Sequence, residues 1–256
     1  MAEVVIVEGE AQAGEIASEL IARLVLSKPN AVLGLATGST PLSTWKALAA
    51  RELDLSKVRG FALDEYVGLP LGHPESYRAV IDREVVIPLH LTPEFIRVPA
   101  DSGPLEFAGE EYENAITDAG GIDLQILGIG VTGHIGFNEP GSSLASLTRV
   151  KTLTDQTRRD NARFFNSIDE VPTHCITQGL GTILRAKHLV LLAFGSAKAQ
   201  TLARAVEGPV TASLPASVIQ LHPNVTVIAD EAAASDLKFA EYYRTAWNSR
   251  LDWERA

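Results

Sequence analysis

The chain has 256 residues, of which 46% are hydrophobic and 21% charged, and its formal net charge at pH 7 is −10. These values suit a soluble α/β protein, and the negative charge disfavours nucleic acid as a partner because phosphate backbones are repelled. The single cysteine excludes an intramolecular disulfide. We find no basic and apolar leader and no apolar run of the roughly 20 residues that a membrane span needs. We therefore expect a cytoplasmic protein with no membrane partner.

Strand-like and helix-like segments alternate along the chain. A helical stripe of Ile16, Leu20 and Leu24 predicts a helix within residues 13–28, which Pro29 follows. Further helices are expected after glycine turns near residues 38 and 195. Apolar runs predict strands within residues 3–8, 31–36, 58–68, 122–130, 188–195 and 224–230. Residues 58–68 are interpreted as one short strand that ends in acidic residues.

Most of the predicted strands are apolar along their whole length, which is typical of strands buried on both faces. With helices between them, they predict a doubly wound, mostly parallel sheet with helices on both faces, which is a Rossmann-like α/β fold. We find no linker, low-complexity segment or fixed repeat, so we predict a single domain over residues 1–256. In such sheets ligands bind beyond the carboxyl ends of the strands, and there the unusual residues of this sequence gather.

The turn at residues 34–41 suits an anion. Gly38 allows a tight turn after a strand, Ser39 and Thr40 can cap the next helix, and Pro41 fits a first helical turn. Backbone amides at a helix start, together with the helix dipole, favour a phosphate. The spacing matches neither a P-loop nor a convincing dinucleotide fingerprint. An ordinary strand-to-helix turn is the alternative.

The turn at residues 194–199 has the same pattern and adds a cation. Gly195 and Ser196 form the turn, and Lys198 lies where the dipole of the following helix disfavours positive charge. A lysine in such a place suggests a bound anion nearby, although a solvated surface lysine is the alternative.

Four titratable side chains lie at or beyond the ends of predicted strands. Asp64 and Glu65 are adjacent, so in an extended segment they face opposite ways and only one of them can serve a given pocket as a general base. His134 lies among glycines that let the backbone approach a ligand, and Glu139 could orient its imidazole. A strand-end turn and a structural histidine are the alternatives. The sequence has no zinc motif, so no metal is predicted.

A local basic cluster stands out in this acidic chain. It could gather an anionic ligand, or it could be the solvated face of a loop and helix. Its members are Arg149, Lys151, Arg158, Arg159 and Arg163.

Together these motifs resemble the glucosamine-6-phosphate deaminase (isomerase) family over nearly the whole chain, in family order and at family-like spacing. The family belongs to a wider group that includes 6-phosphogluconolactonases. The motifs are "GLATGSTP", "LDEYVGLP" with "HPESY", "GHIGFNEPGSSLAS", "TRVKTLT", "ARFF", "FGSAKA" and "IQLHPNVTVIADE".

The resemblance implies a hydrolase of amino-sugar catabolism that converts D-glucosamine 6-phosphate and water to D-fructose 6-phosphate and ammonia, without a cofactor. It implies that Asp64 moves a proton between C2 and C1, through an enolamine-like intermediate. His134 would assist ring opening, with Glu139 as its carboxylate partner. The implied phosphate ligands are Thr37, Gly38, Ser39, Thr40, Arg163 and Lys198. A mobile lid is implied over roughly residues 153–178.

The sequence departs from the family at Thr132, where the family usually has an acid or an asparagine. Threonine can form hydrogen bonds with His134 but brings no charge, so slower ring opening is expected. The departure also leaves room for galactosamine 6-phosphate as the substrate.

Some members of the family are activated by N-acetylglucosamine 6-phosphate at a subunit interface. The matching positions here are Ser142, Ser143, Arg149 and Lys151, while the tyrosine of that site has no secure counterpart. The family spans monomers and hexamers, so a homo-oligomer is one of the expected states.

Two other functions remain open from the sequence. A lactonase-like hydrolase on the same fold would open a phosphosugar lactone with His134 and release no ammonia. A phosphosugar-sensing module would have no need of a base such as Asp64.

Overall fold

A computed structural model describes residues 3–101 and 103–251, and within them seven parallel strands form the central sheet. The predicted domain, 1–256, includes a few residues outside the described ones. In spatial order the strands are β1 (Glu3–Val7), β10 (Val225–Asp230), β9 (Leu189–Ala193), β6 (Leu124–Gly128), β2 (Val32–Leu35), β3 (Arg59–Ala62) and β5 (Ile96–Arg97). Every residue of β2 and β9 is buried, as their unbroken apolar runs predicted. The mostly parallel sheet is confirmed.

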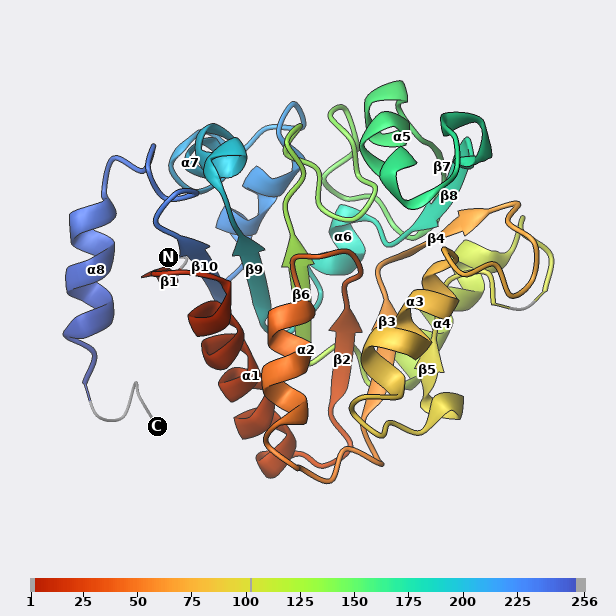
Figure 1. Cartoon of the computed structure of the whole chain (residues 1–256), viewed down its shortest axis with the longest axis horizontal. Helices are drawn as coiled ribbons and strands as arrows, with labels where there is room; N and C mark the ends of the chain where they lie inside the picture. Colours follow the sequence, from red (N-terminus) through yellow and green to blue (C-terminus); the bar gives the residue numbers. More distant parts are fainter. Residues whose placement is uncertain (1–2, 102, 252–256) are drawn as a thin grey trace.

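Helices cover both faces of this sheet (Figure 1). In the view of that figure α1 (Glu10–Ser27), α2 (Leu42–Ala49) and α3 (Tyr77–Ile81) lie in front, and α4 (Ala108–Asp118) and α6 (Leu180–Ile183) lie behind. The two sets arise because right-handed crossovers that run in opposite directions along a parallel sheet place their helices on opposite faces.

Three further helices lie at the margins of the sheet (Figure 1). They are α5 (Asp155–Asn161), α7 (Ala199–Glu207), which follows β9, and α8 (Ala240–Asn248), which packs against the edge strand β1. Short helical turns complete the fold: η1 (Asp82–Val86), η2 (Pro93–Phe95), η3 (Ala162–Phe164), η4 (Ile168–Glu170), η5 (Ser196–Lys198) and η6 (Pro215–Leu221).

The strand order reverses between β2 and β6. From β2 the chain proceeds to β3 and β5 on one side, and it then returns to build β6, β9 and β10 on the other. β2 and β6 are direct neighbours, with Leu33 opposite Leu124. Because their connections leave in opposite directions, a crevice opens at the carboxyl ends of these two strands.

A second sheet contains three antiparallel strands in the order β4 (Asp64–Val67), β8 (His174–Thr177) and β7 (Arg149–Thr152). The prediction of one strand over residues 58–68 was therefore wrong, because the chain changes sheets at Leu63. The Leu63 amide still bonds to the Leu35 carbonyl, at the end of β2. Beyond that point β2 offers no further partner, and Asp64 pairs with Thr177 of β8 instead.

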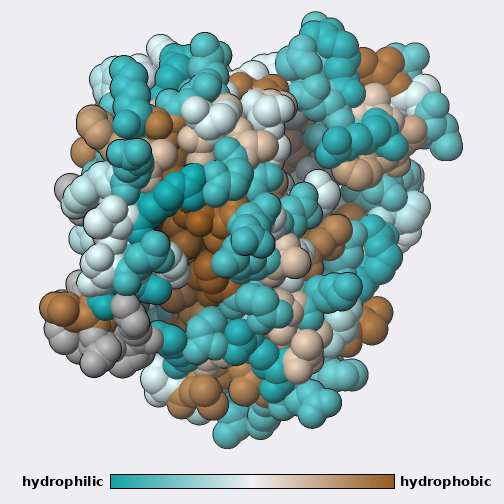
Figure 2. All heavy atoms as spheres, turned by 60° about the vertical axis from the view of Figure 1, so that its left-hand side comes forward, coloured by the Kyte–Doolittle hydropathy of each residue, from teal (hydrophilic) through white to brown (hydrophobic). Residues whose placement is uncertain are grey.

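The main hydrophobic core lies between the large sheet and its helices, and a smaller apolar cluster of Tyr66, Phe137, Leu153 and Cys175 lies beside the second sheet. Figure 2 shows one side of the molecule, whose surface is mostly hydrophilic and has a hollow lined by hydrophobic side chains.

Over residues 3–101 and 103–251, no helix has the length and apolar character that crossing a membrane requires.

Candidate active site

A cavity of about 610 Å³ lies at the carboxyl ends of β2 and β6, where the strand order reverses. Segments far apart in the sequence line it: the turn after β2, the start of β4, the loop after β6, the end of α5 with η3, and the turn after β9. Both central catalytic candidates, Asp64 and His134, line this cavity. So do all six predicted phosphate ligands, namely Thr37, Gly38, Ser39, Thr40, Arg163 and Lys198.

The turn after β2 presents backbone and hydroxyl groups to the cavity. Gly38 has a positive φ of 84°, a conformation that residues with a side chain rarely adopt. The expected capping of α2 by Ser39 and Thr40 was wrong, because Pro41 is the N-cap residue and no side chain caps the helix. The hydroxyl-bearing residues Ser39 and Thr40 therefore line the cavity without being committed to the helix end.

Three cations line the cavity, Arg83, Arg163 and Lys198. Of these, Arg83 donates to the Pro74 carbonyl and to Glu84. Burial lowers the pKa of Lys198, the nearby Asp160 opposes this effect, and the charge of Arg163 lowers the pKa further. The two positive side chains, Lys198 and Arg163, are thus close enough to repel each other, and a bound dianion would relieve that repulsion. A phosphate between these cations and the turn after β2 fits the charges of the cavity.

Asp64 is the first residue of β4 and is only 6% exposed. Its side chain lines the cavity, while Glu65 faces the other side of the strand, as the alternation of side chains predicted. Burial, and secondly the negative charge of Glu65, raises the pKa of Asp64 to about 8. Such a group takes up and releases protons near neutral pH, as a general base must.

Glu65 itself holds the start of α3. Its carboxylate accepts hydrogen bonds from the backbone amides of Tyr66, Tyr77 and Arg78, at 2.7 to 2.9 Å. These bonds fix the position of Tyr77, whose ring packs on Phe137, and both residues line the cavity. Glu65 is therefore a structural partner of the site and not part of its wall.

His134 is held from behind by a threonine and a glutamate. Its Nδ1 atom lies 2.8 Å from Thr132 Oγ1 and 3.2 Å from Glu139 Oε1, and Thr132 donates to Glu139 Oε2 at 3.0 Å. The Thr132 hydroxyl has a single proton, which is committed to the carboxylate. The proton on His134 therefore lies on Nδ1, and Nε2 is left for a ligand.

Glu139 is 6% exposed and stays ionised. Burial raises its pKa, but the hydrogen bond and charge of His134, together with the hydroxyls of Thr157 and Thr132, outweigh burial and lower the pKa to about 2. The ionised carboxylate of Glu139 thus lies beside Nδ1 of the imidazole.

Glycines in the loop after β6 allow close packing around the candidate catalytic histidine. A Cβ atom at Gly130 would lie 2.2 Å from His134 Cε1 and Nε2. Gly136 has a positive φ of 54°, and a Cβ atom there would lie 2.9 Å from Thr177 Oγ1. The sequence predicted close approach of backbone to a ligand, and the structure shows close approach of the backbone at Gly130 to the imidazole.

The predicted basic cluster does not act as a unit. Of its members only Arg163 lines the cavity. Arg158 donates to the carbonyl oxygens of Ile168 and Val171, and Arg149 donates to Asn138 Oδ1 at 2.7 Å. These hydrogen bonds connect α5 to residues 168–171 and β7 to the loop that contains Glu139.

The predicted effector residues lie outside the cavity. Ser142 is buried with no hydrogen-bond partner for its hydroxyl in the described residues, and the hydroxyl of Ser143 accepts from the Ala145 amide. Arg149 and Lys151 alternate with exposed residues on β7. The bond from Arg149 reaches the residue before Glu139, so these positions are linked to the catalytic loop.

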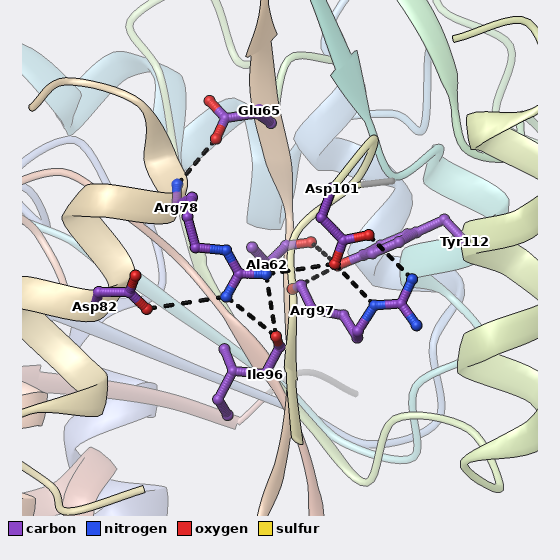
Figure 3. Close-up of polar contacts among 8 residues, drawn as sticks. All are labelled: Ala62, Glu65, Arg78, Asp82, Ile96, Arg97, Asp101 and Tyr112. Carbon is purple, nitrogen blue, oxygen red and sulfur yellow. Dashed lines mark hydrogen bonds and ion pairs between the residues drawn. The ribbon is translucent and has the colours of Figure 1, made fainter. Parts of the chain in front are cut away.

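A larger cavity, of about 870 Å³, opens behind β4, on the side to which Glu65 points. Figure 3 shows that its two arginines are engaged by the chain's own acceptors. Arg78 donates to the Ile96 carbonyl and to Asp101, and Arg97 donates twice to Asp101. This network joins α3 to β5 and the loop after it, so we assign it a structural role.

Comparison with known proteins agrees with the fold. The model of the family of glucosamine-6-phosphate isomerases and 6-phosphogluconolactonases matches residues 8–228. The chain belongs to this family. A glucosamine-6-phosphate deaminase of Bifidobacterium longum (strain DJO10A) is 58% identical over 99% of both chains, and one of Arthrobacter sp. (strain FB24) is 55% identical over 98% of this chain and 99% of its own.

Solved structures of the family have the same fold. A monomeric glucosamine-6-phosphate deaminase superposes with a TM-score of 0.88 at 39% identity, over 92% of this chain and all of its own. A 6-phosphogluconolactonase from Trypanosoma cruzi has a TM-score of 0.75 at 18% identity, over 93% of this chain and 97% of its own, which shows a shared fold.

Sequence analysis missed several residues of the site. Thr157 and Asn161 of α5 line the cavity, as do Tyr77 and Phe164. Tyr77 and Phe164 stand in the quoted motifs "HPESY" and "ARFF", which was the only signal for them. No pattern marks Thr157 or Asn161, because their contacts cross to segments distant in the sequence. In the part of the chain that the structure describes, no three His, Cys, Asp or Glu side chains cluster as metal ligands.

Proposed function

We propose that the protein is a glucosamine-6-phosphate deaminase, which converts D-glucosamine 6-phosphate and water to D-fructose 6-phosphate and ammonia. One observation carries the proposal. A buried carboxylate, Asp64, and an oriented imidazole, His134, share a cavity with the cations Arg163 and Lys198 and with the turn from Thr37 to Thr40. Relatives that are 52% to 58% identical over nearly the full length carry this name.

The phosphate would be bound by the turn from Thr37 to Thr40 together with Arg163 and Lys198. Charge-assisted hydrogen bonds of this kind are stronger than neutral ones, so they would fix one end of the sugar and set the position of C1 and C2. The rest of the sugar would then extend toward Asp64 and His134.

Ring opening would use His134. Its Nε2 atom takes the proton of the anomeric hydroxyl and returns a proton to the ring oxygen, so that the pyranose becomes an open-chain aldehyde. Glu139 stabilises the imidazolium that exists between the two transfers, and Thr132 holds the imidazole through Nδ1.

Isomerisation would use Asp64. Its carboxylate removes the proton from C2, the electrons form a double bond between C1 and C2, and O1 gains the proton that the ammonium group of the substrate gives up, which gives an enolamine. Asp64 then delivers its proton to C1, and the imine left at C2 reacts with water to release ammonia and the ketose. The ammonium group of the substrate would lower the pKa of Asp64 and favour its ionised form. Because water is consumed in releasing the amine, the enzyme would be a hydrolase.

Ammonia release from glucosamine 6-phosphate tests this proposal. Galactosamine 6-phosphate at equal concentration tests the choice of epimer that Thr132 leaves open, and 6-phosphogluconolactone tests the lactonase alternative. We expect ammonia from the gluco substrate. No ammonia from either amino sugar would reject the deaminase, and lactone hydrolysis without ammonia would favour the lactonase.

The proposal extends to regulation, closure and cellular location. Ser142, Ser143, Arg149 and Lys151 would bind N-acetylglucosamine 6-phosphate, residues 153–178 would close over the substrate, and the enzyme would work in the cytoplasm. The last residues of that segment, from His174 to Thr177, form β8, so closure would involve the part before it. Hyperbolic saturation that the acetylated sugar does not change would reject activation.

A further inference from the structure

A chain of hydroxyl groups joins α5 to the catalytic pair of His134 and Glu139. Thr157, on α5, is only 3% exposed, and its hydroxyl makes a short hydrogen bond to Glu139 Oε1. The hydroxyl of Thr154, the N-cap residue of α5, in turn donates to Thr157 Oγ1 at 3.1 Å. A side chain of the helix therefore binds the carboxylate that orients the imidazole.

The direction of these bonds is fixed by the groups involved. An ionised carboxylate only accepts, so Thr157 and Thr132 must both donate their single protons to Glu139. Glu139 thus has a hydroxyl donor on each oxygen, and the remaining contact on Oε1 is that of His134 Nδ1, at 3.2 Å. Loss of the Thr157 donor would make Oε1 a stronger acceptor. Oε1 would then compete with Thr132 Oγ1 for the proton on His134 Nδ1.

The same helix carries part of the cavity wall. Asn161, at the end of α5, donates to the hydroxyl of Tyr66 on β4 at 2.8 Å, and Arg163 follows in η3. The α5 segment, residues 155–164, therefore has two effects on the site. Its position decides where Arg163, the proposed phosphate ligand, lies, and it decides whether Glu139 receives its second hydroxyl donor, Thr157.

We propose that Thr157 is a positioning residue, which makes the orientation of the His134 imidazole depend on α5 being seated on the cavity. Without the seated helix, Glu139 Oε1 would draw the Nδ1 proton of His134 away from Thr132 Oγ1 and change the orientation of the ring. This inference rests on the proposed function, in which His134 acts on the sugar ring.

Three substitutions test the inference in the full-length protein. Thr157→Val keeps the shape of the side chain and removes the donor, Thr157→Ser keeps the donor, and Thr154→Val removes the N-cap of α5 but leaves the contact with Glu139. A hydrogen bond to a charged group corresponds to about a 10- to 100-fold effect. We expect Thr157→Val to lower kcat for ammonia release by that factor with KM changed less than about threefold.

The other two variants separate positioning from stability of the helix. Thr157→Ser should restore kcat to within about threefold of the parent value, and Thr154→Val should lower kcat much less than Thr157→Val does. Equal loss in Thr154→Val and Thr157→Val, or no rescue by serine, would overturn the inference in favour of a purely structural role for Thr157.

A readout without turnover keeps this inference distinct from the proposed function. In ¹⁵N-histidine NMR spectra we expect the Nδ1–H resonance of His134 to coincide in the parent protein and Thr157→Ser, and to shift in Thr157→Val because its acceptor changes. An unchanged spectrum in Thr157→Val would refute the positioning role. If the spectrum changes but the parent protein releases no ammonia, the positioning role stands and the deaminase proposal fails.

Discussion

At the scale of single residues, Asp64 combines deep burial with a place on the cavity wall. A carboxylate that is 6% exposed loses solvation when it ionises, and the adjacent Glu65 adds repulsion, so its pKa is raised to about 8. Its partner in the proposed chemistry, Glu139, has the opposite environment, because hydroxyl donors and His134 lower its pKa to about 2. Two buried acids thus differ in ionisation because, among the residues that the structure describes, only Glu139 is given hydrogen-bond donors that lower its pKa.

Replacing Asp64 with asparagine tests its role as the base. Asparagine keeps the size of the side chain but cannot accept the C2 proton, so we expect Asp64→Asn to lower kcat for ammonia release by about 10²- to 10⁴-fold. Binding of fructose 6-phosphate, measured by calorimetry, should change little because the phosphate residues are untouched. Asp236→Asn, which alters an exposed carboxylate, is the control. Unaltered turnover in Asp64→Asn would remove Asp64 as the base.

At the scale of elements, β4 and the loop after β6 place side chains that line the same cavity. β4 turns Asp64 into the cavity and Glu65 toward α3, which Glu65 holds through the backbone amides of Tyr77 and Arg78. The loop after β6 brings His134 to the same cavity. A short strand in a second sheet thus connects the base to the helix that fixes Tyr77.

The raised pKa of Asp64, at the start of β4, predicts how activity depends on pH. The proposed chemistry needs the ionised form of Asp64. We therefore expect kcat/KM to rise about tenfold per pH unit and to level off above pH 8, near the pKa of Asp64 in the free enzyme. Glu65→Gln removes the neighbouring negative charge, which should lower the pKa of Asp64 and move the midpoint of the profile to lower pH. Because glutamine also disturbs the start of α3, the midpoint and not the maximal rate is the readout. A midpoint that stays in place would show that Glu65 does not influence the base.

The loop after β6 makes a steric prediction. In Gly130→Ala the new methyl group would meet the imidazole of His134 at 2.2 Å and push it from its place beside Thr132. We expect kcat to fall at least about 100-fold, with a melting temperature within about 5 °C of the parent value. Gly9→Ala is a matched control, since a Cβ atom there has nothing within 4 Å. Full activity of Gly130→Ala would mean that the imidazole does not need its present position.

At the scale of the whole molecule, the sheet gathers an anion site within an acidic protein. The chain has a net charge of −10, yet Arg163 and Lys198 come from different connections to the same cavity. Lys198 follows β9 of the parallel sheet, and Arg163 lies in η3 between β7 and β8 of the second sheet. The fold thus brings two cations from distant segments to the crevice that the reversal of strand order opens.

Binding of an anion should consequently stabilise the fold. A ligand that binds only the native state at about 100 times its Kd adds about 2.7 kcal/mol to the unfolding free energy, which corresponds to a rise of about 5 °C or more in melting temperature. We expect this rise with fructose 6-phosphate, and little of it in Lys198→Met. Fructose at the same concentration is the control for the sugar. Equal stabilisation by fructose and fructose 6-phosphate would contradict a phosphate site.

Particular elements show how far the sequence could be interpreted. The continuous apolar runs of β2 and β9 predicted buried parallel strands, because only such strands can be apolar on both faces. The break at Leu63 is marked only by the acidic residues that follow it, which do not indicate a change of sheet, and the end of β2 decides where the chain changes sheets. The prediction that Ser39 and Thr40 cap α2 was wrong, because the helix begins one residue later and Pro41 is its N-cap residue.

The sequence by itself determined the alternation of strands and helices, the anion-type turns and, through the family motifs, the identity of Asp64, His134 and Glu139 as candidates. These features depend on residues close together in the chain. The tertiary structure alone decided that Thr132 donates to Glu139, that Thr157 of α5 reaches the same carboxylate, and that Gly130 makes room for the imidazole. Contacts of this kind depend on which strand ends become neighbours, and hydrogen-bond direction follows only once donor and acceptor have been brought together.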